Sequence, residues 1–175
     1  SVKILRRPYQ TIIKYNGKSF INFTSNEVPI NQVVRTILED KDGNLWFGGN
    51  YGIYKYDGSK FIHFTVNEGL AVNNVMNLFE DEKGNIWIGT YGGGIQIFDG
   101  ENLIQYSDKN GLSNSFILSS CYDDHGNMWF GTNGGGINKI DNRFISHFCE
   151  NDGLIHNKVR SVFEDNFGNI WFGTY

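Results

Sequence analysis

Short apolar segments alternate with polar turns along the chain. In one stretch, the apolar segments occupy residues 75–79, 86–89, 95–98 and 103–106. Asp81 opens the polar turn between the first two segments, and the pair Asp99-Gly100, a strong hairpin signal, separates the last two. Short apolar runs bounded by Gly, Asn and Asp are typical of antiparallel strands. The pattern therefore predicts four short strands in this stretch.

The same stretch recurs along the chain. The tryptophans are Trp46, Trp87, Trp129 and Trp171, at intervals of 41, 42 and 42 residues. An Asp six residues before each Trp and a Gly two residues after it complete the repeat. Repeats near 40 residues that hold four strands each are the signature of β-propeller blades.

Counting strands along the chain gives the domain organisation. We expect one all-β, β-propeller segment over residues 1–175, a partial ring of about four blades, each a four-stranded antiparallel sheet. Complete blades are predicted at residues 33–64, 74–106 and 117–148, with blade parts at 11–23 and 159–175. The two parts either join into a ring of four or belong to a larger ring. Residues 1–10 match the second-strand position poorly and Trp171 already occupies it, which favours the larger ring.

Each tryptophan is expected to pack between adjacent blades, because a single blade exposes apolar groups on both faces. Truncation of such a buried indole costs about 3–5 kcal/mol.

Composition narrows the function classes. The 175 residues carry a formal charge of −4, which argues against binding to a nucleic-acid backbone. No apolar run is long enough to span a bilayer, so no direct membrane contact is expected. Aromatic residues make up 15% of the chain and it contains 22 glycines, which fits many short strands joined by turns.

No metal, cofactor or catalytic site is predicted. Cys121 and Cys149 do not have the spacing of a metal site and are expected to be small, at least half-buried hydrophobes. The histidines are scattered over different repeats, and His63 and His147 are expected to have surface or packing roles. The four repeated aspartates lie in turns, and one reaction centre does not need four copies.

The repeat resembles a known family. The string Val75-x-x-Leu78-x-Glu80-Asp81-x-x-Gly84-Asn85-Ile86-Trp87-Ile88-Gly89-Thr90-x-x-Gly93-Gly94 is similar to the two-component regulator propeller repeat. The resemblance implies a periplasmic sensor region of a bacterial hybrid histidine kinase, often sensing a carbohydrate breakdown product. It implies a location on the periplasmic or extracellular side of a bacterial membrane protein.

Candidate ligand contacts lie where the repeats differ. Loops between second and third strands, and connections between blades, share one face of the disc, and loops on a rigid scaffold are common binding sites. The first-strand arginines Arg35 and Arg160 add positive charge that suits an anionic sugar. The candidate residues are Asn50, Tyr51, Tyr91, Asn133, Asn74, Asn114, His156, Asn157, Arg35 and Arg160. Asn is also a preferred turn residue, so a purely structural role is the alternative.

Three functions remain open at this level. The leading hypothesis is an extracytoplasmic sensor propeller that binds an oligosaccharide or another small ligand. The alternatives are a protein-interaction scaffold without a small ligand and a propeller lyase or glycosidase. Expected partners also include the remaining blades of a parent ring or another copy of the chain.

Overall fold

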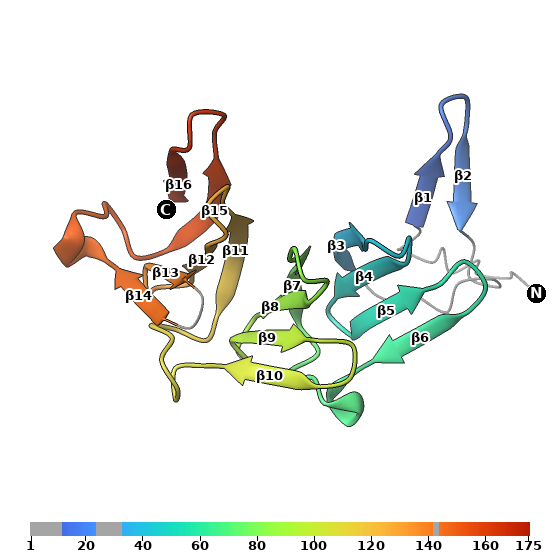
Figure 1. Ribbon diagram of the computed structural model, residues 1–175, viewed down its shortest axis with the longest axis horizontal. Helices are drawn as coiled ribbons and strands as arrows, with labels where there is room; N and C mark the ends of the chain where they lie inside the picture. Colours follow the sequence, from blue (N-terminus) through green and yellow to red (C-terminus); the bar gives the residue numbers. More distant parts are fainter. Residues whose placement is uncertain (1–11, 24–32, 142–143) are drawn as a thin grey trace, which may run out of the picture.

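The computed structural model describes residues 12–23, 33–141 and 144–175 and shows an arc of antiparallel sheets (Figure 1). Three four-stranded sheets form the middle of the arc, and a two-stranded sheet stands at each end. Strands within each sheet follow chain order, and consecutive strands pair antiparallel. The chain is therefore an all-β partial propeller, which confirms the predicted fold class.

The strand bounds follow the repeat. The first two-stranded sheet consists of β1 (Ile12–Tyr15) and β2 (Phe20–Phe23). The first complete blade contains β3 (Val34–Glu39), β4 (Leu45–Gly49), β5 (Gly52–Tyr56) and β6 (Phe61–Phe64). The second contains β7 (Val75–Glu80), β8 (Ile86–Thr90), β9 (Ile95–Phe98) and β10 (Leu103–Tyr106). The third contains β11 (Ile117–Tyr122), β12 (Met128–Thr132), β13 (Ile137–Asp141) and β14 (Phe144–Phe148). The last sheet consists of β15 (Val159–Glu164) and β16 (Ile170–Thr174).

Short 3-10 turns connect some blades. They span η1 (Val66–Glu68) and η2 (Glu150–Asp152), and each ends at a glycine with positive φ, Gly69 or Gly153. In the first of them, Thr65 and Glu68 cap each other's backbone amides, which fixes where the chain turns into the next blade.

The repeated Asp-x-x-Gly-Asn segment folds as predicted into a tight turn. Asp40 Oδ1 accepts hydrogen bonds from the backbone amides of Asp42 (3.1 Å) and Asn44 (2.8 Å). Gly43 has a φ of +80°, a conformation that favours glycine. Local chemistry therefore determines this turn.

Neighbouring blades pack through their tryptophans. Trp46 is 2% exposed and lies in a core with residues of the next blade, including Ile86 and Ile88. The indole of Trp87 stacks on Phe130 of the third blade, with ring centroids 6.0 Å apart. The ring of Trp129 packs on that of Phe172 in the last sheet, with ring centroids 5.7 Å apart. These three positions confirm the predicted inter-blade packing.

Trp171 corrects the prediction for the fourth copy. Its side chain is 61% exposed, and its sheet has two strands rather than four in the part of the chain that the structure describes. Phe163, which pairs with Trp171 in the same two-stranded sheet, is exposed as well. The face that is buried in the other repeats is therefore open here.

The glycine after each Trp allows the next blade to approach. A Cβ on Gly48 would lie 2.7 Å from Val75 Cγ1, and one on Gly131 would lie 2.8 Å from Val159 Cγ1. Both valines belong to the first strand of the following blade. The repeat therefore has glycine where a side chain would push two blades apart.

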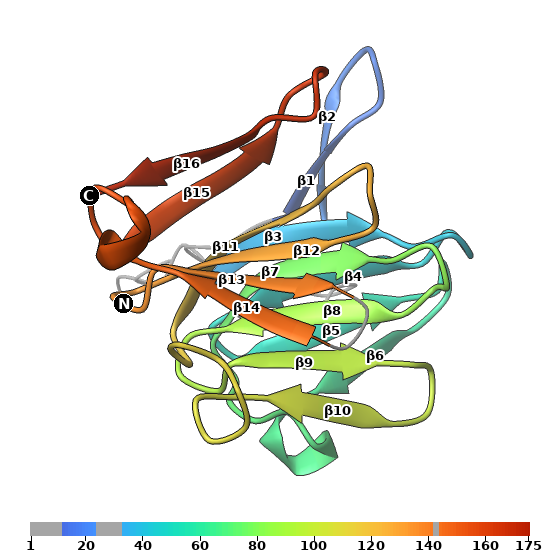
Figure 2. The same ribbon diagram turned by 60° about the vertical axis from the view of Figure 1, so that its left-hand side comes forward.

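The two terminal sheets form separate units at opposite ends of the arc (Figure 1). Strands β1 and β2 do not pair with β15 and β16 in this structure. In the view of Figure 2 the complete blades overlap, and their strands run roughly horizontally. Residues 1–10 and Thr11, which entered the prediction of blade boundaries, lie outside the described residues.

Candidate functional site

The first strands β3, β7, β11 and β15 lie against one another and form the inner side of the arc. In the last three sheets, the residue after the second strand bonds to the residue just before the first strand of its own sheet. The amide of Tyr91 donates to the carbonyl of Asn74 (2.8 Å), and that of Asn133 donates to the carbonyl of Phe116 (2.9 Å). Backbone bridges then join Tyr91 to Phe116 and Asn133 to Lys158 across the blade junctions. These residues therefore form a continuous row, which we call the inner rim.

Each first strand carries a β-bulge near its start. The pairing with the second strand shifts between Val34 and Thr36, and in the last sheet between Val159 and Ser161. The extra residues are thus Arg35 and Arg160, both exposed, and in the middle blades Met76 and Leu118. Bulges of this kind redirect a side chain and are frequent beside binding sites. The structure places both predicted arginines at this position.

Two predicted residues meet across a blade junction. Asn133 Nδ2 donates a hydrogen bond of 3.1 Å to the hydroxyl of Tyr91, 42 residues earlier. The Tyr91 ring also packs edge-on against Phe116, with centroids 4.8 Å apart. Tyr91 is 37% exposed, so part of its ring faces solvent. The pair presents an aromatic surface beside an amide, which suits a polyhydroxylated or peptide-like ligand.

Arg35 is held by the neighbouring blade. Its guanidinium donates to Asn74 Oδ1 at 2.7 Å and lies 3.8 Å from Met76 Sδ. Both contacts come from residues at the start of β7. The arginine is thereby held by the neighbouring blade while its side chain stays exposed.

Two cationic side chains also lie over the ring of Tyr175. Lys158 Nζ lies 4.8 Å and Arg160 Cζ 5.2 Å from the centre of its ring. His156 lies 6.3 Å from the same ring. Sequence reasoning selected His156 and Arg160 but missed Lys158 and Tyr175. A signal existed for Tyr175, which follows Gly173-Thr174 as Tyr91 follows Gly89-Thr90.

Several predicted residues support the backbone. Asn50 Oδ1 accepts from the amide of Val33, and Asn114 Oδ1 from that of Phe116. Asn157 Oδ1 accepts from the amide of Glu150. These side-chain oxygens bond to backbone amides, which is the kind of structural role that the alternative expects. Tyr51 is 57% exposed, and its carbonyl oxygen lies 2.8 Å from His63 Nε2.

The histidines named for packing roles do pack. The His63 ring stacks on Tyr54 with centroids 3.9 Å apart, and His147 Nδ1 lies 2.7 Å from the buried Asn138 Oδ1. Both cysteines are free and half-buried, as expected.

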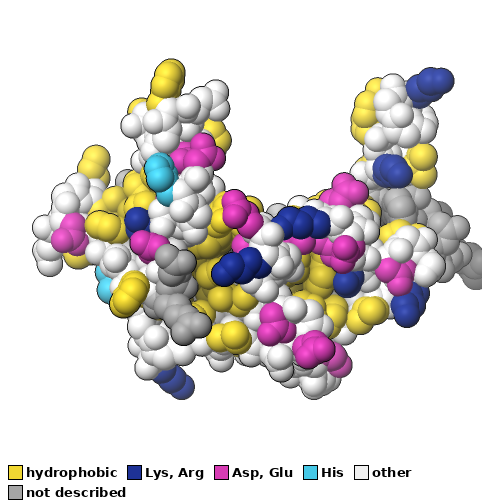
Figure 3. Space-filling model, viewed as in Figure 1, with side chains coloured by type: hydrophobic (Ala, Val, Ile, Leu, Met, Phe, Trp, Pro, Cys, Tyr) yellow, Lys and Arg dark blue, Asp and Glu magenta, His cyan; other side chains and the backbone are white. Residues whose placement is uncertain are grey.

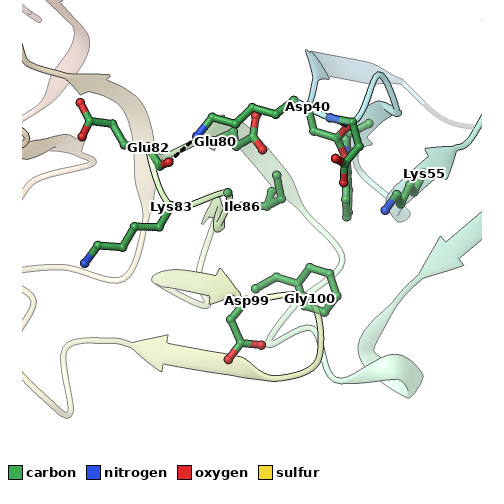
Figure 4. A pocket seen from close by; sticks show the side chains of 13 residues that line it. Asp40, Lys55, Glu80, Glu82, Lys83, Ile86, Asp99 and Gly100 are labelled. Atoms are coloured by element: carbon green, nitrogen blue, oxygen red, sulfur yellow. Dashed lines mark hydrogen bonds between the residues drawn. The ribbon is translucent and has the colours of Figure 1, made fainter.

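Two clefts lie on the other face, at the Asp-containing turns. One of about 380 Å³ lies between the first two complete blades and is lined by Asp40, Lys55, Glu80, Glu82, Lys83 and Asp99, among others (Figure 4). Figure 3 shows acidic and basic side chains alternating around an apolar floor in this region. A second cleft, of about 240 Å³, lies between the second and third blades.

The first cleft is largely a seam between blades. Glu80 Oε2 accepts from the amide of Lys41 at 2.8 Å, and Lys41 Nζ donates to the carbonyls of Asp81 (2.8 Å) and Glu82 (2.5 Å). Its charged groups therefore join the two turns to each other. In the next seam Tyr122 stands at the position of Glu80, and its ring stacks on Phe79 instead.

Hydrogen bonds keep the turn aspartates ionised. Burial raises the pKa of Asp40 and Asp81, but the bonds from the indole N–H and the Asn side chain outweigh it, so both pKa values lie below the usual one. At the exposed Asp165, the bonds from Asn169 and Trp171 lower the pKa to about 2. A carboxylate held this firmly is suited to structure rather than to proton transfer.

Among the described residues, no three His, Cys, Asp or Glu side chains are grouped so that they could hold a metal ion. The helices within the described ranges are also too short and too polar to cross a membrane.

Solved structures share this architecture. The extracellular domain of BT4673 from B. thetaiotaomicron, described as a hybrid two-component system, is 29% identical with a TM-score of 0.69. The match covers 81% of this chain and 22% of that one, so the chain spans about a fifth of its relative.

Two further structures are similar in fold alone. Virginiamycin B lyase from Staphylococcus aureus, solved with quinupristin, is 19% identical with a TM-score of 0.74, over 93% of this chain and 55% of that one. PorZ, a surface component of the type-IX secretion system of Porphyromonas gingivalis, is 16% identical with a TM-score of 0.66, over 91% and 28%. None of the curated proteins matches the chain significantly.

The sequence also matches a family of repeats. The two component regulator propeller matches residues 28–51, 69–92, 111–134 and 153–175, which together make up more than half of the chain. Each match contains one first strand, one Asp turn and one second strand. The chain therefore belongs to the two-component regulator propeller family.

Proposed function

We propose that this chain is part of an extracytoplasmic sensor propeller that binds a small ligand and passes the signal to a two-component system. The observation that carries the proposal is the fourfold match to the regulator propeller repeat. The 29% identity to the extracellular domain of a protein described as a hybrid two-component system supports the same role and location.

The inner rim is the proposed ligand site. It combines the exposed guanidinium groups at the bulges, Arg35 and Arg160, with aromatic and amide side chains at Tyr91 and Asn133. Arginine forms paired hydrogen bonds to carboxylate or sulfate groups, and aromatic rings pack against sugar rings. An oligosaccharide that carries acidic groups fits this chemistry best.

The bulge position itself supplies matched variants. Met76 and Leu118 occupy it in the middle blades, so Arg35→Met and Arg160→Leu place side chains that the same backbone already accommodates. We expect the double variant to fold with nearly unchanged stability but to lose its response to an acidic oligosaccharide.

A thermal-shift experiment tests the proposal. The chain is screened against acidic and neutral oligosaccharides of equal length. A ligand at 100 times its dissociation constant adds about 2.7 kcal/mol of stability, which raises the melting temperature by roughly 5–10 °C in a domain of this size. A control variant, Lys60→Met, changes the charge of a remote hairpin and should respond like the unmodified chain. If the ligand raised the melting temperature of the double variant and of the unmodified chain equally, the arginines would not be part of the ligand site.

A protein-interaction scaffold is the second candidate. The side-chain oxygens of Asn50, Asn114 and Asn157 are engaged by backbone amides, which leaves fewer polar groups for a small ligand. If the chain is an interaction scaffold, we expect that no oligosaccharide in the screen stabilises it. We then expect the arginine variants to bind a protein partner more weakly. Titration of the purified chain with candidate partner domains measures this directly.

A further inference from the structure

The cleft of about 240 Å³ between the second and third complete blades has an aromatic and apolar lining. The rings of Trp87 and Tyr122 line it together with the buried side chain of Met128. Trp87 is half-buried, so part of its indole remains accessible. Both sheets that enclose the cleft have all four strands, so it is a feature of complete blades.

In the first and third complete blades a lysine lies over the repeated tryptophan. Lys55 Nζ lies 4.8 Å from the centre of the Trp46 ring, and Lys139 Nζ lies 5.3 Å from that of the Trp129 ring. Each lysine is the direct cross-strand partner of its tryptophan. The face of an indole attracts a cation, so these lysines occupy a position that favours an ammonium group.

The second blade has no lysine at this position. The cross-strand partner of Trp87 is Ile97, whose side chain carries no charge. The Trp87 ring therefore receives no ammonium group from the strand beside it.

A second cation of the first seam is also replaced. Lys41 Nζ reaches across that seam to the backbone carbonyls of Asp81 and Glu82, in the turn of the next blade. In the second blade the residue that corresponds to Lys41, directly after the turn aspartate, is Glu82. Relative to the first seam, the second has therefore lost two cations and gained a carboxylate.

The charges that line the second cleft are mainly negative. Asp81, Glu82 and Asp141 supply carboxylates, against the basic side chains of Lys83 and His125. Burial raises the pKa of the Tyr122 hydroxyl, and the negative charges of Glu82 and Asp81 raise it further. The two carboxylates thus act on a group inside the cleft.

We propose that this cleft binds an alkylammonium group, which takes the place over the Trp87 ring that a lysine side chain occupies in the neighbouring blades. The indole face attracts the cation, and the carboxylates of Asp81 and Glu82 supply the opposite charge. The cleft is smaller than a typical pocket for a drug-sized ligand, about 300–1,000 Å³. It therefore suits a group of the size of one lysine side chain, carried by a free amine or by a peptide.

This site is separate from the ligand site proposed at the inner rim. The cleft lies on the face of the Asp-containing turns, and its lining includes none of the rim residues. Its occupant therefore does not depend on the acidic oligosaccharide proposed above, and either proposal can fail without the other.

NMR titration of the 175-residue chain tests the site directly. The probes are cadaverine, a five-carbon diamine, and a blocked pentapeptide with one central lysine among glycines. Pentanediol and the same peptide with norleucine in place of lysine are the uncharged controls. We expect a saturable shift of the Trp87 indole N–H resonance with at least one charged probe. The indole resonances of Trp46 and Trp129 should stay in place, because their own lysines cover these rings.

The two charged probes distinguish the source of the ammonium group. Tighter binding of cadaverine assigns the cleft to a free amine, and tighter binding of the peptide assigns it to a lysine of a protein. The proposal is overturned if neither charged probe shifts the Trp87 resonance. Equal shifts with the uncharged controls, or at all three indoles, also overturn it.

Ile97→Lys provides the sharpest variant. It places a lysine where the first and third blades already have one, so the sheet should fold normally and the new side chain should fill the site. We expect the affinity for the charged probe to fall about tenfold. Asn67→Lys adds the same charge on the exposed turn η1 and should bind like the unmodified chain. Equal affinities for the two lysine variants would contradict the site, and circular dichroism confirms that both fold.

Glu82→Gln tests the contribution of charge. Glu82 is exposed, and removing its charge should weaken binding roughly threefold, the usual range for an exposed ion pair. Glu101→Gln removes an equal charge from an exposed position of the β9–β10 turn, outside the lining of this cleft, and should leave the affinity unchanged. If both variants lost affinity equally, the cation would be attracted by the net charge of the chain and not by this cleft.

Discussion

Asp40 Oδ2 accepts a hydrogen bond of 2.7 Å from the indole Nε1 of Trp46, six residues later in the chain. The same bond recurs in the other repeats, at 3.0 Å for Trp87, 2.7 Å for Trp129 and 2.8 Å for Trp171. One carboxylate therefore closes the turn through Oδ1 and orients the inter-blade indole through Oδ2. Turn geometry and blade packing are coupled through a single side chain.

We predict that Asp40→Asn destabilises the chain by about 2 kcal/mol, because hydrogen bonds to a charged group are lost beside a buried indole. Asp165→Asn is the matched control, since it makes the same bonds around the exposed Trp171 and should cost less. Urea denaturation of both variants measures the difference. Equal losses would show that burial of the indole is irrelevant to the effect.

Stability should fall in acid. The amides of Lys60 and Ser59 and the Ser59 hydroxyl lower the pKa of Asp57 to about 2, and that of Asp165 is also about 2. Because these pKa values lie below those of the unfolded chain, about 3.9, their contribution is complete above that value and is lost as the pH falls toward 2. The urea midpoint measured from pH 6 to pH 2 checks this. A midpoint that stays constant down to pH 2 would contradict the depressed pKa values.

Gly131→Ala should destabilise the chain by about 1–3 kcal/mol, the usual cost of overpacking. The new methyl group would meet Ser119 of its own blade. It would also lie 2.8 Å from each of two atoms of the next blade, Cγ1 and the carbonyl oxygen of Val159. Gly173→Ala meets only Ser161 and should be tolerated better, since that serine can rotate. Thermal unfolding measures the loss of stability in each variant, at Gly131 where the next sheet lies close and at Gly173 where it does not. A larger loss of stability for Gly173→Ala would refute the explanation.

Gln96→Asn should cost about 1 kcal/mol, the net value of one hydrogen bond. Gln96 Oε1 accepts from the amide of Ala71 (2.7 Å) and Nε2 donates to the carbonyl of Gly69 (3.1 Å), which ties the connecting loop to the third strand. In the next blade the shorter Asn138 keeps the first type of bond, to Ser113, but its buried Nδ2 has no hydrogen-bond partner. Chemical denaturation detects the loss, and an unchanged midpoint would mean that Nε2 contributes nothing.

The candidate site was only partly accessible to sequence reasoning. Arg35 and Arg160 could be selected because they interrupt an apolar position of the repeat, and the structure adds the bulge that redirects them. The Tyr91–Asn133 bond could not be derived, since it joins residues 42 positions apart on different blades. Tyr175 and Lys158 were missed because their contact forms only when the fold places the side chains of Lys158 and Arg160 over the Tyr175 ring.

By itself, the sequence determined the period, the strands and the Asp-Gly turns, because these depend on interactions within a few residues. Glycine at positive φ and an aspartate that caps nearby amides act without help from distant parts of the chain. The tertiary structure alone decided which indoles are covered and which asparagine side chains bond to backbone amides. It did so because burial at each repeat depends on whether a neighbouring sheet lies against it. Trp46 is 2% exposed because Ile86 and Ile88 of the next blade lie in the same core with it.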